Sequence, residues 1–488
     1  MMEYVPLLIT VSYIVVAVIF GVSAGKGKDM SKMEEWGVAD RTFGSVYMYL
    51  LIGAGGVSSY TFLGSPGWAF DKGVPALYVV IYLTYMALIA WYFGPKVNEL
   101  GLKFHHVTQS SSIADRYESK GLGAVASIAT AVGPVCYAVI QTTGAALILN
   151  IMSYGLIPMW LGVLISLVAV AIYVFKSGLR AIGITNVIQG ALMFVVAWLT
   201  GLWATNQFTG GFSFRPIFER VQAEVPEYLT LPGGLGDMGP AFWTTSILIS
   251  FFSIWQYNWV QWLGAKSPNS IKRSVALLPT YYLVLIPMII VGFIGVFVYP
   301  EIANSDTVAI SYAVDHMPVV LAGLLGAGTL AASMSSSEPN FHATALSLSN
   351  DILKPWLKWD DETAGKWTRW LIFPVMAIVA PIAIAEPASL VYILLIGYGF
   401  IAQSFPSVIG MFLWPRATKQ GTMWGLIAGF LVTILCSFVF VHPLGIHGGI
   451  WGLAVNTLIF IGLSLITQPA SKETIERFFP EMVDELYE

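Results

Sequence analysis

The chain has 488 residues, of which 56% are hydrophobic and only 11% are charged, and its mean hydropathy is +0.73. Because a soluble domain carries about 25% charged residues, this composition excludes a soluble protein and predicts an integral membrane protein surrounded by lipids. The formal net charge of −4 and the lack of a basic tract argue against a nucleic-acid partner.

Apolar stretches separated by polar loops predict thirteen membrane-spanning helices in one compact domain. A run of about 20 apolar residues crosses a hydrocarbon core of roughly 30 Å. The fold class expected is therefore all-α integral membrane. The predicted spans are residues 4–24, 44–70, 74–93, 121–151, 156–175, 182–206, 240–263, 274–299, 318–350, 367–385, 388–414, 421–441 and 448–467.

The distribution of lysine and arginine distinguishes the two sides of the membrane. With the N-terminus outside, the inner loops and the C-terminal tail hold all of the 24 basic residues except Lys72, Arg215 and Arg220. Basic residues are enriched in cytoplasmic loops. We expect a multi-pass protein of the cell membrane with its N-terminus outside and its C-terminus inside.

Polar residues interrupt the ninth predicted span over residues 333–342. Residues three and four apart share a face of a helix, so Ala332, Ser335, Ser336, Glu338 and His342 form one polar side. Polar and ionisable groups inside a membrane face the bundle interior and mark ion or substrate paths.

Two spans are expected to break near their middle. The second carries GAGGVSS at residues 53–59 and GSPG at residues 64–67, and the seventh is interrupted by polar residues between Ser250 and Asn258. Paired glycines weaken a helix and free backbone carbonyls that can coordinate a cation, although close packing through small residues is the simpler alternative. The two breaks begin five spans apart, which favours two inverted five-helix repeats.

The segment YGFIAQSFPSVIGMFLWPRATKQGTMWGLIAG, residues 398–429, resembles the signature of the solute:sodium symporter family. Smaller pieces agree with it, namely Arg41, the GSPG segment, Tyr137 with Gln141 and Gly144, and LGAKS at residues 263–267.

The resemblance implies the inverted-repeat fold of the bacterial leucine transporter. The repeats would be residues 44–206 and 240–414. An extra N-terminal helix and loop would occupy residues 1–43, two extra C-terminal helices residues 415–470, and a cytoplasmic tail residues 471–488.

The resemblance also implies a sodium ion between the broken second span and the ninth. Carried over, its ligands would be the carbonyls of Ala54, Val57 and Ala332 and the hydroxyls of Ser335 and Ser336. Neutral oxygens suit a hard monovalent cation that has to be released, whereas a carboxylate cage favours divalent ions.

The sequence departs from several relatives at a second cation site. An Asp in their sixth span corresponds to Asn186 here, and a hydroxyl of their ninth span corresponds to Glu338. Asn186 and Glu338, with His342, are therefore predicted as a second cation or proton site. In the alternative, Glu338 stays protonated on a hydroxyl partner and only packs, with His342 as its hydrogen-bond partner.

The family's solute cavity lies at mid-membrane between the broken helices. We expect no basic residue there, which favours a small carboxylate or an amino acid whose charge is met by helix ends and Na⁺. The candidate solute-binding residues are Gly55, Gly56, Ser58, Ser59, Tyr137, Gln141, Phe251, Phe252, Gln256 and Gln403.

The function expected is sodium-coupled symport of a small organic solute into the cell by alternating access, not enzymatic catalysis. A proton-coupled symporter that titrates Glu338 is the main alternative. A membrane sensor is less favoured, because the tail after residue 467 is too short for a kinase domain. The oligomeric state is left open between a monomer and an oligomer.

Overall fold

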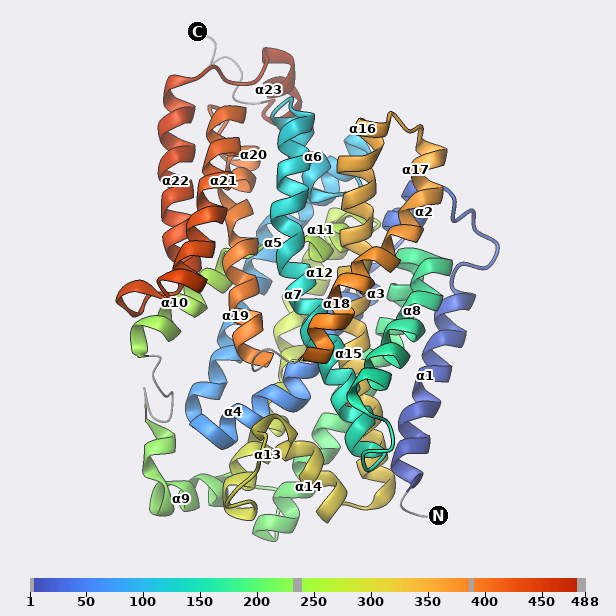
Figure 1. The fold of residues 1–488 in the computed structure, drawn as a ribbon, viewed down its shortest axis with the longest axis vertical. Coiled ribbons are helices and arrows are strands. Elements are labelled where there is room, and N and C mark those ends of the chain that lie inside the picture. Colours follow the sequence, from blue (N-terminus) through green and yellow to red (C-terminus); the bar gives the residue numbers. More distant parts are fainter. Residues whose placement is uncertain (1–3, 231–238, 386–389, 481–488) are drawn as a thin grey trace.

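The computed structural model describes residues 4–230, 239–385 and 390–480, and this part of the chain is helical without a strand. Figure 1 shows the helices gathered into one elongated bundle. The helices of the first half are α1 (Val5–Ser23), α2 (Met33–Val38), α3 (Ser45–Gly56), α4 (Ser65–Lys72), α5 (Tyr78–Phe104), α6 (Gln109–Arg116), α7 (Lys120–Met152), α8 (Met159–Thr209) and α9 (Arg215–Glu224).

The second half repeats this mixture of long and short helices. They are α10 (Pro240–Phe251), α11 (Gln256–Leu263), α12 (Pro268–Tyr282), α13 (Leu285–Val298), α14 (Val308–His316), α15 (Val319–Ser347), α16 (Lys354–Leu357), α17 (Asp361–Thr368), α18 (Ile372–Ala385), α19 (Leu390–Ile401), α20 (Phe405–Phe412), α21 (Lys419–Ile434), α22 (Gly448–Ile466) and α23 (Lys472–Phe478).

Helix α15 is the central element of the bundle. Its residues are continuously buried from Leu325 to Ser347, and it packs against α1, α7 and α8. Small residues make this packing possible. A Cβ on Gly326, for example, would lie 2.4 Å from the Thr10 hydroxyl of α1. The polar face predicted from the sequence is therefore enclosed by protein and not by lipid.

Consecutive helices that follow one another without a sharp bend can be counted as one segment. On that count, ten segments of the described residues are long and apolar enough to cross a membrane, or eleven if the bent pair α3–α4 forms one span. Two of the thirteen predicted spans lie in α8, whose course is interrupted at Gly178 with φ +51°. A Cβ on Gly178 would lie 2.2 Å from the Trp36 carbonyl oxygen. Glycine suits this position because it adopts a positive φ without strain and has no Cβ.

Both predicted helix breaks are present. Helix α3 ends at Gly56, Val57 is extended, and the chain resumes as a helix at Tyr60 with a bend of 57°. Helix α10 ends at Phe251 and α11 starts at Gln256. The segments between the helices leave backbone groups without helical partners near the centre of the bundle.

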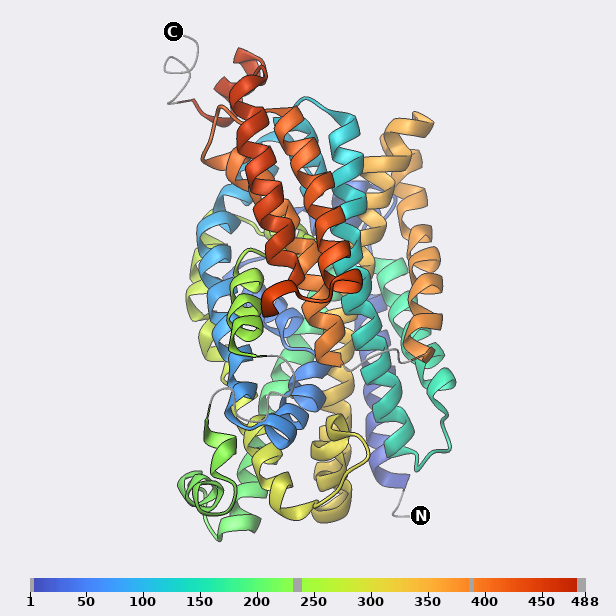
Figure 2. The same ribbon diagram turned by 60° about the vertical axis from the view of Figure 1, so that its left-hand side comes forward.

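The start of α1 and the C-terminal helix α23 lie at opposite ends of the bundle (Figures 1 and 2). Helix α23 docks on α6, where Arg477 contacts both carboxylate oxygens of Asp115 at 2.8 and 3.2 Å. Burial works to raise the pKa of Asp115, but hydrogen bonds from His106 and Arg477 outweigh it and lower that pKa. Three of the predicted segments extend beyond the described residues, namely the N-terminal segment at residues 1–3, the second repeat at residues 386–389 and the tail at residues 481–488.

Candidate cation and solute site

The five residues predicted to bind sodium come together where α3 ends beside α15. The Ser335 hydroxyl lies 3.0 Å from the carbonyl oxygens of both Ala54 and Ala332, and the Ser336 hydroxyl lies 3.3 Å from that of Val57. All five residues are fully buried. Three carbonyl and two hydroxyl oxygens are thereby gathered without a carboxylate among them.

The break in α3 exposes more acceptors than the serines can satisfy. The Ser336 hydroxyl also lies 3.1 Å from the Gly55 carbonyl oxygen. A hydroxyl has one proton to donate, so two serines satisfy at most two of the four carbonyls at a time. A cluster of buried oxygens that lacks donors is chemically suited to a cation. Asn340 fixes the far side of this turn, since its amide donates to the Ser336 carbonyl oxygen at 2.7 Å.

The residues of the second predicted cation site have hydrogen-bond partners of their own. Glu338 is fully buried, and its carboxyl contacts the Thr185 hydroxyl at 3.0 and 3.3 Å. Asn186 instead donates to the Leu51 carbonyl oxygen at 3.3 Å. Figure 1 places α8, which carries Thr185 and Asn186, next to α15.

The prediction that His342 is the hydrogen-bond partner of Glu338 is wrong. The His342 Nε2 atom lies 3.0 Å from the Trp36 carbonyl oxygen, and its Nδ1 has no partner among the described residues. The imidazole is stacked on the Trp36 ring at 4.3 Å. Although one helical turn separates His342 from Glu338, the imidazole is held by the segment before α3. Within the described part of the chain, no group of three or more His, Cys, Asp or Glu residues could hold a metal ion.

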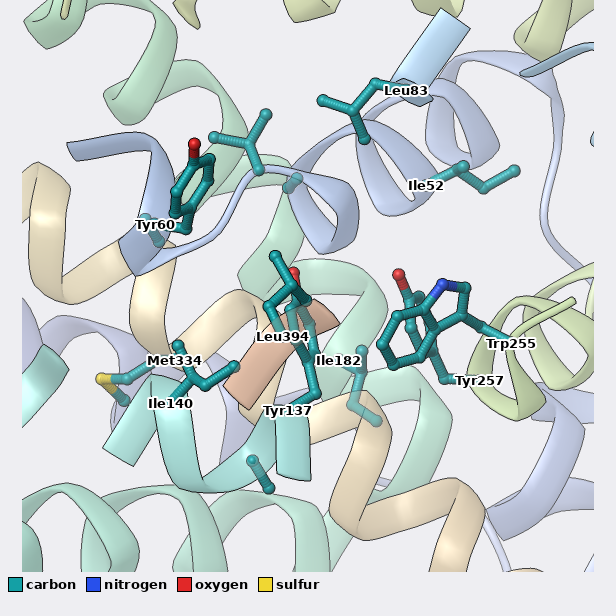
Figure 3. Packing of buried hydrophobic residues seen from close by; sticks show 14 of the residues in the cluster. Ile52, Tyr60, Leu83, Tyr137, Ile140, Ile182, Trp255, Tyr257, Met334 and Leu394 are labelled. Carbon is teal, nitrogen blue, oxygen red and sulfur yellow. The ribbon is translucent and has the colours of Figure 1, made fainter. Parts of the chain in front are cut away.

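An aromatic cavity adjoins the end of α3. The rings of Tyr137 and Trp255 are 4.9 Å apart, and Trp255 also contacts Tyr257 and Tyr398 at 5.6 and 5.5 Å. Figure 3 shows Trp255 beside Tyr257, with Tyr137 on the neighbouring helix. The cavity measures about 20 Å³, so these rings have to separate before an organic solute can enter. It is lined by Ile52, Gly56, Tyr82, Leu83, Met86, Ala90, Tyr137, Trp255, Tyr257, Asn258, Leu278, Tyr282 and Tyr398.

Among the predicted solute-binding residues, Gly56 and Tyr137 line this cavity. The Tyr137 hydroxyl lies beside the hydroxyls of Ser58 and Ser336, so one side chain adjoins both the cavity and the predicted sodium ligands. Ser59 contacts the Gln141 side-chain oxygen through its amide at 2.9 Å and its hydroxyl at 2.8 Å. This pair anchors the break in α3 to α7.

Four other candidates do not line this cavity. Gln256 donates to Thr130 and Ser347, and Phe251 and Phe252 contact each other with ring centroids 5.2 Å apart. The Gln403 amide donates to the carbonyl oxygens of Gly399 and Gly449, and the Asn456 amide donates to its oxygen at 3.3 Å. Gln403 therefore fastens α22 to the region between α19 and α20, and it does not line the aromatic cavity.

Two features of the site were missed in the sequence analysis. One is the ring of tyrosines that α5, α12 and α19 contribute to the cavity. The other is Gln261, a fully buried glutamine on α11 whose two polar atoms have no hydrogen-bond partner among the described residues. The glutamine in the apolar sequence WVQWL was a signal of the same kind as Gln256.

Two arginines hold the segment before α3 at the end of the bundle that carries α6 and α23 (Figure 1), which we call the basic end. Arg41 donates to the carbonyl oxygens of Leu263 at 3.1 Å and His106 at 2.9 Å. Arg180 pairs with Glu35 and donates to the Ala39 carbonyl oxygen at 3.1 Å. We call residues 34–43 with Arg180 the latch. A hollow of about 1050 Å³ adjoins the latch, and its lining includes the latch residues Glu34, Glu35 and Asp40.

Comparison with known proteins shows to which family the chain belongs. A model of the sodium:solute symporter family matches residues 36–429. The chain is 24% identical to the sodium/pantothenate symporter of Escherichia coli over 463 residues, covering 92% of this chain and 94% of that protein. It is 25% identical to a sodium/proline symporter of Staphylococcus aureus over 495 residues, covering 95% and 93%.

The fold agrees with solved transporters. A Na⁺-coupled sialic acid symporter, captured outward-open with substrate bound, superposes with a TM-score of 0.79 at 18% identity, covering 96% of this chain and 99% of that one. A nucleobase-cation-symport-1 family transporter superposes with a TM-score of 0.59 at 16% identity, covering 90% and 97%. The protein is thus a multi-pass membrane transporter and not an enzyme, and the chain belongs to the sodium:solute symporter family.

Proposed function

We propose that this protein is a sodium-coupled symporter that carries a small organic solute, a carboxylate or an amino acid, into the cell. The observation that carries the proposal is the cluster of neutral oxygens from Ala54, Val57, Ala332, Ser335 and Ser336 between α3 and α15. Such a cluster suits a monovalent cation that must be bound and then released.

Alternating access is the mechanism that this arrangement favours. Na⁺ binding would hold the end of α3 against α15, and Tyr137 would transmit this ordering to the aromatic cavity that it lines. A ligand shifts a conformational equilibrium only by its differential affinity for the two states. The membrane potential would add about 2.3 kcal/mol per charge per 100 mV. Opening of the latch would then release ion and solute on the basic side.

The complete membrane topology is part of the same proposal. Thirteen spans result if α8 counts as two at Gly178 and the pairs α3–α4 and α10–α11 each count as one. Residues 44–206 and 240–414 would then be the inverted repeats, each beginning with a broken helix. The basic end would face the cytoplasm, with the start of α1 outside and α23 inside.

A proton-coupled symporter is the second candidate, because Glu338 is a fully buried carboxyl beside the cation cluster. Its contact with the Thr185 hydroxyl also satisfies a carboxyl group that only packs. The sodium proposal needs no change in Glu338 during transport.

Uptake by purified protein in lipid vesicles tests the proposal. Radiolabelled L-proline, L-alanine, pantothenate and acetate are offered under an inward Na⁺ gradient and under a matched K⁺ gradient. We expect one of these solutes to accumulate with Na⁺ alone, and Ser336→Ala to abolish that accumulation. Uptake of a solute that proceeds equally with K⁺, or that survives Ser336→Ala unchanged, would refute sodium coupling at this site.

A further inference from the structure

The C-terminal helix α23 is docked on the basic end of the bundle by an apolar face. Ile475 and Phe479 lie one helical turn apart, so they share a face of the helix, and both are buried. Phe478 packs on the Phe104 ring at the end of α5, with ring centroids 5.5 Å apart. Helix α23 has only seven residues, and so short a helix is not stable in isolation. Its contacts with the bundle therefore hold it in place.

Polar contacts join the same helix to α6 and the turn after it (Figure 1). The hydroxyls of Ser471 and Thr474 donate to the Glu118 carboxylate, the latter at 2.6 Å. Arg477 contacts both carboxylate oxygens of Asp115 at 2.8 and 3.2 Å. The side chains of Arg477 and Asp115 are 35% and 28% exposed. This ion pair is therefore accessible from water and can separate without unfolding the bundle.

Asp115 connects α23 to the latch. Its Oδ2 atom, which Arg477 contacts, also lies 3.0 Å from the Nε2 atom of His106. The backbone carbonyl oxygen of His106 accepts a hydrogen bond from Arg41 at 2.9 Å. Because Arg41 belongs to the latch, three consecutive contacts lead from α23 through α6 and the residues before it to the latch.

The start of α6 is fixed to the end of α15. Thr108 is the N-cap of α6, and its hydroxyl donates to the Asp351 carboxylate at 2.8 Å. The other oxygen of Asp351 accepts a hydrogen bond from Ser347 of α15 at 2.6 Å. Helix α6 is thus held at its start by α15, which carries the proposed sodium ligands, and at its end by α23. The carbonyl group that Arg41 contacts lies just before this clamped helix.

We propose that α23 is a regulatory strap, which keeps the latch closed while Arg477 is bound to Asp115 and lets it open when the two separate. In the docked state Asp115 holds the His106 ring, and the same residue presents its carbonyl oxygen to Arg41. The inference goes beyond the proposed symport and rests on it only in taking latch opening as a step of transport.

Two arginines then act on the latch by different routes. Arg180 holds it through Glu35 and the Ala39 carbonyl oxygen, and neither contact involves α6. Arg477 acts through Asp115. Groups that act independently have additive effects, whereas groups in one chain of contacts do not. A chain of contacts is demonstrated as a coupling only when its members behave in this way.

Alkylation of a single cysteine measures opening of the latch. Val38 is fully buried, so Val38→Cys, in a background without Cys136 and Cys436, should react only when the latch opens. The purified full-length protein is labelled without Na⁺ or solute. We expect Arg477→Met to raise the labelling rate about threefold, the size expected of a partly exposed ion pair. Lys472→Met, which removes an exposed basic residue of the same helix, should leave the rate unchanged.

Double variants test the route. In Arg180→Met, adding Arg477→Met should again raise the rate about threefold, because the two arginines act independently. Asp115→Asn should raise the rate by itself, since it weakens the contacts with both His106 and Arg477. Adding Arg477→Met to Asp115→Asn should then have little further effect.

The inference is overturned if Arg477→Met labels no faster than Lys472→Met, even if its melting temperature falls, because α23 would then only stabilise the fold. It is also overturned if the effect of Arg477→Met is undiminished in Asp115→Asn, or if it disappears in Arg180→Met. The labelling requires neither Na⁺ nor a solute. Its outcome is therefore independent of the Na⁺-dependent uptake on which the proposed function depends.

Discussion

At the scale of the residue, the serines of α15 differ in function because they face different neighbours. Ser333 bonds back to the Thr329 carbonyl oxygen of its own helix at 3.1 Å, whereas Ser335 and Ser336 reach across to α3. Only a serine that crosses to the broken helix can add its oxygen to the cation cluster. The same chemical group is therefore structural at one position and a proposed ion ligand two or three residues later.

The amide variant of Glu338 separates sodium coupling from proton coupling. Glutamine keeps the shape of the side chain and a partner for the Thr185 hydroxyl, which lies 3.0 Å from the carboxyl, but it cannot exchange a proton. We expect Glu338→Gln to retain Na⁺-driven uptake in vesicles, with a rate that changes little between pH 6 and pH 8. Uptake that ceases in Glu338→Gln, and that follows an imposed pH gradient in the wild type without Na⁺, would favour the proton alternative.

The place of a residue in the site was predictable where a sequence motif specified it. It was less predictable where packing between distant parts of the chain determines the partner of a side chain. The resemblance placed Ser335 and Ser336 beside the break in α3, and the structure brings them there. It could not reveal that Trp36 on α2, 306 residues earlier in the chain, holds His342. Nor could helical spacing show that Gln403 faces α22 and not the cavity.

At the scale of the element, the break in α3 depends on close contact with α7. A Cβ on Gly144 would lie 2.5 Å from the Ser59 Cβ. Gly144→Ala should therefore displace Ser59, weaken its contacts with Gln141 and destabilise the protein by about 1–3 kcal/mol. Thermal unfolding of the purified protein measures this effect.

Gly121 is the matched control on the same helix, since a Cβ there meets nothing within 4 Å. Gly121→Ala should leave the melting temperature unchanged or raise it slightly, because alanine favours a helix by up to about 1 kcal/mol over glycine. Equal effects of the two substitutions would show that contact with Ser59 is not what requires glycine at position 144.

Hydropathy predicted the helical elements well, because the length of an apolar run is set by the bilayer. The breaks were predictable as well, since Gly53, Gly55 and Gly56 lower helix propensity and polar residues interrupt α10–α11. The boundary inside α8 is a different case. Only the backbone of Gly178 interrupts that helix, so the number of spans depends on one residue's conformation.

At the scale of the whole molecule, the latch at the basic end contains three consecutive residues with a strained backbone. Ala39, Asp40 and Arg41 have φ angles of 51°, 51° and 52°. Left-handed conformations cost a non-glycine residue roughly 1–2 kcal/mol each. The contacts of Arg180 and Arg41 offset this cost in the structure. Opening of the latch would relieve the strain and lose the contacts, which is the balance expected of a gate.

Removal of Arg180 should bias the protein toward opening at this end. A cysteine in place of the buried Val38, in a background without Cys136 and Cys436, reports access by its rate of alkylation. We expect Arg180→Met to raise that rate at least tenfold, which corresponds to about 1.4 kcal/mol. Lys358→Met removes an exposed basic residue and should not change it. Equal labelling rates with and without Arg180 would mean that the latch does not control access.

The most direct test of the central claim is the thermal stability of the purified protein in NaCl against matched KCl. A ligand that binds only the folded protein stabilises it by about 2.7 kcal/mol at one hundred times its dissociation constant. The account predicts a Na⁺-specific rise in melting temperature for the wild type and for Ser333→Ala, and its loss in Ser336→Ala. Identical melting temperatures of the wild type in the two salts, or an undiminished Na⁺ effect in Ser336→Ala, would contradict a sodium site between α3 and α15.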